Sequence, residues 1–172
     1  VKVMCDTLDI IAAEKIKTTG ALDANLVEVY GSTQSDDLRR KIAAHIVQKY
    51  TANCEKESFE TVLSYEAINH ELYLQITEQA IIKSDEFLNM CAQHALKNSG
   101  YSSFIEKNCD EVCIDRVVNK MAEIVMGVKP QQQVALAIIK NPMHTQMIDV
   151  ILKHESCGDI IWEYVKVAYA NQ

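Results

Sequence analysis

Apolar residues recur every three to four positions along nearly the whole chain, which is the spacing of one face of an α-helix. The clearest stripe covers residues 38–49, and its members, at helical spacing, are Leu38, Ile42, His45, Ile46 and Lys49. Asp36 and Asp37 stand just before it, where negative charge interacts favourably with the dipole of a helix. Ser35 or Asp36 is also a suitable N-cap residue. The pattern therefore predicts a helix that begins near Asp36.

Similar stripes predict helices along the rest of the chain. Ser84 is expected to start a helix that includes Cys91 and Ala95, and the stripe from Phe104 to Val125 predicts one long helix that closes at Gly127. The glycines are expected at helix ends and the prolines at helix starts. These punctuating residues are Gly20, Gly31, Gly100, Gly127, Gly158, Pro130 and Pro142.

The chain is therefore expected to be all-α, with eight or nine short helices in a single domain over residues 1–172. With only five glycines and two prolines, it has too few turn residues for a β-rich fold. An irregular bundle is favoured over helix pairs stacked as in a HEAT-type solenoid. Because the chain begins at Val1 without an initiator methionine, we expect it to be the C-terminal part of a longer protein.

The charge balance disfavours nucleic acid as a partner. The chain has 17 basic and 24 acidic residues and a net charge of −7, whereas binding to phosphates depends on lysine and arginine. The longest apolar run, 134–139, is far shorter than the ~18 residues that a membrane span requires. We therefore expect a protein partner and no membrane association.

Six cysteines leave two interpretations open. In a secreted chain they could form three disulfides, which would give a disulfide-stapled helical ligand-binding protein. The favoured interpretation is buried, reduced thiols, because such cysteines usually behave as small apolar residues. The absence of an Asn-x-Ser/Thr sequon agrees with this interpretation. An intracellular protein, cytoplasmic or nuclear, is expected, and a secreted one is the alternative.

No motif in the sequence indicates an enzyme. The chain contains no Gly-x-Gly-x-x-Gly sequence, no phosphate-binding loop and no Gly-x-Ser-x-Gly elbow. Each glycine is also isolated, so the backbone has no glycine-rich loop that could cradle a phosphate. We therefore expect no catalytic residue and no cofactor.

Four residues have a spacing that could suit zinc. Cys91 and His94 are three apart, and Cys109 and Cys113 are four apart, so each pair would lie on one face of a helix. A helical hairpin that joined the pairs would supply a tetrahedral Cys3His site. All three cysteines also continue apolar stripes, so the favoured interpretation is that they are packing residues.

Three short motifs stand between Val3 and about Tyr50, and their residues are Leu8, Asp9 and Ile10, then Val29, Tyr30, Ser32 and Thr33, then Asp37, Leu38 and Arg39. With these motifs the segment resembles the helical region that follows the BTB/POZ core, particularly in fungal-type BTB proteins. The resemblance implies an interaction scaffold whose dimerising core would precede Val1.

Residues 101–107 read Tyr-Ser-Ser-Phe-Ile-Glu-Lys, and a second related stretch covers residues 143–148. Through these stretches the segment 101–150 is similar to Pumilio-type RNA-binding repeats. The similarity implies that Ser102 and Glu106 read the edge of a base. RNA binding by a divergent repeat protein is therefore a further alternative, which the acidic composition disfavours.

These observations favour a non-enzymatic adaptor domain that binds a partner helix or peptide in an apolar groove between helices. Tyrosine and tryptophan are enriched among the residues that dominate binding energy at protein interfaces. Each could equally be an ordinary packing residue. The candidate anchors are Tyr30, Tyr65, Tyr73, Tyr101, Trp162 and Tyr164.

Overall fold

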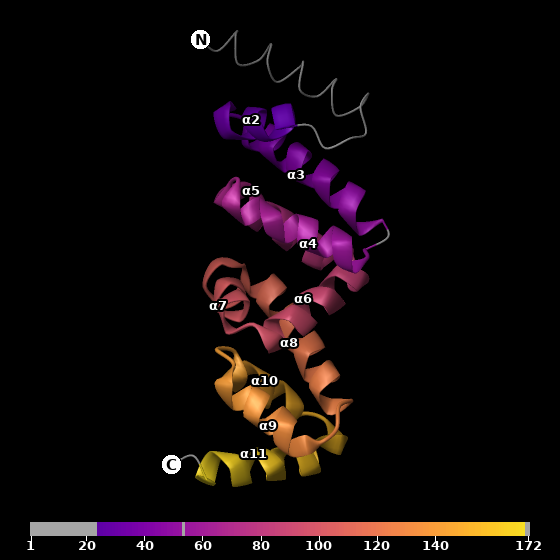
Figure 1. Ribbon diagram of the computed structural model, residues 1–172, viewed down its shortest axis with the longest axis vertical. Coiled ribbons are helices and arrows are strands. Elements are labelled where there is room, and N and C mark those ends of the chain that lie inside the picture. The colour runs from indigo at the N-terminus through magenta and orange to yellow at the C-terminus, as the bar shows by residue number, and fades with distance from the viewer. Residues whose placement is uncertain (1–23, 53, 171–172) are drawn as a thin grey trace. The chain divides into compact units, whose positions relative to one another are not determined.

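The computed structural model describes residues 24–52 and 54–170, and it confirms the all-α prediction. These residues form ten α-helices and two short 3-10 helices, and they contain no β-strand (Figure 1). The resemblance residues Leu8, Asp9 and Ile10, the glycine at position 20 and Cys5 lie outside the described residues.

The chain divides into two compact units, one ending at Phe87 and the other beginning at Leu88. Each unit has its own buried core and is described by itself. Whether the two units together make the single domain expected from the sequence stays a prediction.

The first unit is built around the packing of two helices, α3 (Asp36–Thr51) and α5 (His70–Lys83). Ile42 and Ile46 of α3 and Leu72 and Ile76 of α5 are completely buried. The other elements of this unit are α2 (Ala24–Ser32), α4 (Lys56–Ser64) and the 3-10 helix η1 (Tyr65–Ala67).

The second unit begins within helix α6 (Asp85–Lys97), since Leu88 is its first residue. Its last helix, α11 (Gly158–Ala170), packs on α9 (Gln131–Lys140). Helix α10 (His144–Ile151) packs on α8 (Glu111–Met126) and also contacts α9. The remaining elements are α7 (Ser99–Asn108) and the 3-10 helix η2 (Glu155–Cys157). Apolar side chains such as Ile105, Met121 and Met147 are completely buried.

Two helix starts follow the caps that the sequence indicates. The hydroxyl Oγ of Ser35 accepts a hydrogen bond of 3.2 Å from the backbone N–H of Leu38, which confirms the predicted start of α3. Ser84 caps α6 in the same way, accepting from the N–H of Phe87 at 3.1 Å. Each cap satisfies a backbone donor that the helix itself cannot pair.

The prediction of one long helix from Phe104 to Val125 is wrong. Cys109 has an extended backbone, and the side chain of Asp110 accepts a 2.8 Å hydrogen bond from the N–H of Cys113. The extended backbone of Cys109 ends α7 and the Asp110 cap starts α8, which is one reason why the described residues form more helices than the eight or nine expected. Gly100 and Gly158 also lie at the beginnings of helices, not at their ends.

Candidate functional site

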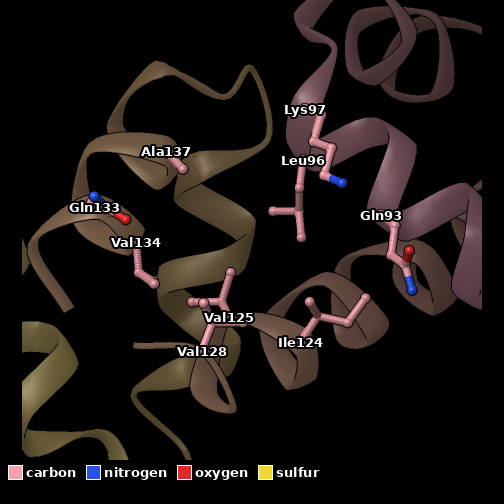
Figure 2. A pocket seen from close by; sticks show the side chains of 9 residues that line it. All are labelled: Gln93, Leu96, Lys97, Ile124, Val125, Val128, Gln133, Val134 and Ala137. Carbon is pink, nitrogen blue, oxygen red and sulfur yellow. The ribbon is translucent and has the colours of Figure 1, made fainter. Parts of the chain in front are cut away.

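An apolar groove lies within the second unit, where three helices present side chains to one hollow of about 360 Å³ (Figure 2). This volume is at the lower end of the ~300–1,000 Å³ typical of binding pockets. We call it the α6–α8–α9 groove. Its lining residues are Gln93, Leu96, Lys97, Ile124, Val125, Val128, Gln133, Val134 and Ala137.

Helical periodicity explains how each segment contributes to the groove. Leu96 lies three residues after Gln93 on α6, and Ala137 lies three residues after Val134 on α9, so each pair shares one helix face. Figure 2 shows the α6 side chains on one side and the α9 side chains on the other, with those of residues 124–128 between them. The groove therefore has two walls, and α8 with its following turn forms the floor.

The floor ends at an exposed apolar side chain. Gly127 caps α8, and Val128, in the turn that follows, has 45% of its surface exposed. Val125 and Val134 are buried, so they anchor the groove in the core of the unit, while Val128 is open to a ligand. From the sequence, none of these three residues was expected to belong to a binding site.

The polar side chains of the groove are Gln93, Gln133 and Lys97. Lys97 is the only titratable side chain among the nine lining residues. A general acid–base pair needs two groups that can exchange protons, and the groove does not supply them. The groove is therefore suited to bury apolar groups of a ligand, and Gln93, Gln133 and Lys97 can add polar contacts.

A second apolar surface lies on α11. Trp162, Val165 and Tyr169 follow one another at helical spacing, and Trp162 and Tyr169 have 62% and 74% of their surface exposed. The ammonium group of Lys166 lies 5.8 Å from the centre of the Trp162 ring and forms a 2.7 Å ion pair with Glu163. Trp162 is therefore held against α11 and is accessible, as the anchor hypothesis requires.

The structure corrects the role of four other aromatic candidates. Tyr30, Tyr65, Tyr73 and Tyr101 are buried because they belong to the apolar faces of their helices. Their rings are packing groups in this fold and are not accessible to a partner. Tyr164 is half-buried on α11.

The four candidate zinc ligands are not brought together. Among the residues that the structure describes, no three His, Cys, Asp or Glu side chains are placed to hold a metal ion. The thiol of Cys91 instead lies 2.7 Å from the hydroxyl of Tyr101, and the His94 ring packs edge-on against the same tyrosine at 4.7 Å. Cys109 precedes α8 whereas Cys113 lies within it, so the two do not share a helix as expected.

The cysteines of the described part of the chain are all thiols. Cys91, Cys109 and Cys113 are buried, and Cys54 and Cys157 are half-buried. Burial raises the pKa of the Cys54 thiol, and the nearby carboxylate of Glu86 raises it further.

None of the described helices combines the length and apolar character needed to cross a lipid bilayer.

The residues of the two resemblances are used within the protein. Ser102 is completely buried, and its hydroxyl donates a hydrogen bond to the side chain of Asn141, so it is not available to read a base. Arg39 donates to the carbonyl oxygens of Tyr30 and Thr33 and thereby joins α2 and its following loop to α3. Ser102 and Arg39, which the resemblances treat as family motif residues, therefore stabilise the fold of this chain.

Comparisons with known proteins add no assignment. No family model matches the chain, and neither the curated proteins nor the solved structures contain a significant match. The resemblances to BTB and Pumilio proteins therefore stay predictions.

Proposed function

We propose that the chain is a non-enzymatic protein-interaction domain that binds a short helical or extended segment of a partner protein in the α6–α8–α9 groove. The observation that carries this proposal is the groove itself, in which six of the nine lining residues are apolar. Grooves between helices commonly receive an amphipathic helix, whose apolar face replaces water on the groove surface.

Val128 provides the test, because it lines the groove and is already partly exposed. We expect Val128→Gln to leave the fold intact and to weaken peptide binding about three- to ten-fold, since part of a valine side chain contributes about 1 kcal/mol on burial. Val112→Gln is the matched control. Val112 is a 61% exposed valine of the same unit, on α8, and it does not line the groove.

The experiment uses peptides selected against the whole chain from a display library of helical peptides. Binding of the selected peptides to both variants is then measured by fluorescence anisotropy. Peptides that lose affinity for Val128→Gln and keep it for Val112→Gln support the proposal. If no selected peptide depends on Val128, the groove is not the binding site and the proposal is refuted.

A further inference from the structure

The α6–α8–α9 groove differs in charge from the rest of the molecule. The chain has 24 acidic residues and a net charge of −7, yet none of the nine lining residues is acidic. The single charge in the groove is the ammonium group of Lys97. Within the described part of the chain, Lys97 has no ion-pair partner. The nine lining residues thus carry one positive and no negative charge, in a chain that is acidic overall.

The position of Lys97 determines what a ligand must offer. Lys97 is exposed, and it follows Gln93 by four residues on α6, so the two polar side chains lie one above the other on the same helix face. A partner helix that covers Leu96 removes water from the neighbouring ammonium group. Loss of hydration without a compensating contact disfavours binding, whereas a carboxylate at that point restores a charge-assisted hydrogen bond.

We propose that the groove selects peptides with an aspartate or glutamate at the edge of their apolar stripe, placed so that the carboxylate reaches Lys97. This inference rests on the proposed function and specifies the chemistry of the partner. Lysine is a compact point charge, so one carboxylate is sufficient and no planar, bidentate arrangement is needed.

The position of the acidic residue in the peptide matters more than the peptide's net charge. At long range, the net charge of −7 opposes every acidic peptide to a similar extent. Two peptides of identical composition therefore isolate the contribution of Lys97, if one has its glutamate at the edge of the apolar stripe and the other has it on the opposite helix face.

The test starts from the peptides selected against the whole chain, each of about 14 residues, which is about four helical turns. Each peptide is resynthesised as the two glutamate isomers. We expect the edge isomer to bind about two- to five-fold more tightly than its partner at low salt, the range measured for partly exposed ion pairs. With Lys97→Met the two isomers should bind equally.

The outcomes separate the two proposals. If the peptides depend on Val128 but the isomers bind equally to the wild-type chain, selection by Lys97 is refuted and the groove remains the binding site. If the edge isomer is still preferred by Lys97→Met, another group provides the selectivity and the inference is also refuted. If no peptide depends on Val128, the proposed function itself fails.

Discussion

The hydroxyl of Ser102 on α7 donates a 2.7 Å hydrogen bond to Oδ1 of Asn141, a residue 39 positions further along the chain. Both side chains are buried. The amide Nδ2 of Asn141 donates in turn to the carbonyl oxygen of Ala95 on α6 at 3.0 Å, and its Oδ1 also accepts from the N–H of Met143. One asparagine therefore joins α6, α7 and the turn that follows α9. Helix α6 and helix α9, which ends directly before Asn141, are the walls of the α6–α8–α9 groove.

Asn141→Ala is expected to lower the free energy of unfolding by about 2–4 kcal/mol, because it leaves three buried polar groups unpaired. Ser102→Ala removes only one of these hydrogen bonds and should cost about 0.5–1.5 kcal/mol. Urea denaturation measures both values. Asn119→Ala is the control, since Asn119 is exposed and its side chain donates a hydrogen bond to the carbonyl oxygen of Asp115 within α8. A loss for Asn141→Ala no larger than that for Asn119→Ala would contradict the role of this network.

Arg39→Ala is expected to destabilise the first unit by about 1–2 kcal/mol, because Arg39 donates to two backbone carbonyls of the preceding helix and loop. Arg39 also forms an ion pair of 3.0 Å with Asp36. The neighbouring Arg40 provides the comparison. Among the described residues its only ion pair is an exposed one of 3.9 Å with Asp37, so Arg40→Ala should change stability by less than about 0.5 kcal/mol. Equal effects of the two substitutions in urea denaturation would show that Arg39 does not stabilise this junction.

Stability at high pH should depend on Tyr30. Burial raises the pKa of Tyr30 to about 12, and the carboxylate of Glu71 contributes to this shift. Above pH 10 the unfolded state releases this proton before the folded state does, so stability present below pH 10 is lost as the pH rises towards 12. The loss from Tyr30 amounts to about 3 kcal/mol at most.

Tyr30→Phe should therefore reduce the loss of stability between pH 10 and pH 12, measured by urea denaturation at each pH. At pH 7 the substitution should cost little, because the Tyr30 hydroxyl is buried and has no hydrogen-bond partner among the described residues. Tyr169→Phe, at an exposed position, should leave the alkaline loss unchanged. Parallel pH curves for Tyr30→Phe and the wild type would contradict the prediction.

Thiol titration tests both the burial of the cysteines and the disulfide-stapled alternative. In the native protein, Cys54 and Cys157 should react with a thiol reagent, while the buried Cys91, Cys109 and Cys113 should react only after unfolding. Because Glu86 raises the pKa of Cys54, Glu86→Gln should speed the reaction of Cys54 at pH 8. Six thiols in the denatured, unreduced protein would exclude the stapled alternative, and two or fewer would support it.

The sequence predicted the fold class and two of the helix starts at which a side chain caps the backbone. Ser35 and Ser84 stand directly before apolar stripes, so both the cap and the helix were visible. The cap at Asp110 was missed because the cysteines at 109 and 113 continue the apolar stripe across the break. Periodicity alone does not register a change of helix direction when apolar residues lie on both sides of it.

The groove could not be predicted from periodicity. Val125 and Val128 belong to one stripe, but the first is buried and the second is partly exposed, because α8 ends between them at Gly127. The same limit applies to the aromatic anchor candidates. Tyr101 and Trp162 are equally suitable as anchors by composition, and only the packing of α6 against α7 or the open face of α11 distinguishes them. The one signal of the groove in the sequence was Val128, an apolar residue directly after Gly127, where a helix end is predicted.

The walls and floor of the α6–α8–α9 groove come from three segments spread over residues 93–137, so the groove exists only when those helices have folded together. A ligand that binds there binds the folded chain and not the unfolded one. At a concentration one hundred times its Kd, such a ligand raises the free energy of unfolding by about 2.7 kcal/mol. Thermal denaturation can therefore be used to search for natural partners. A ligand of the groove raises the melting temperature, and the increase grows with the logarithm of the ligand concentration.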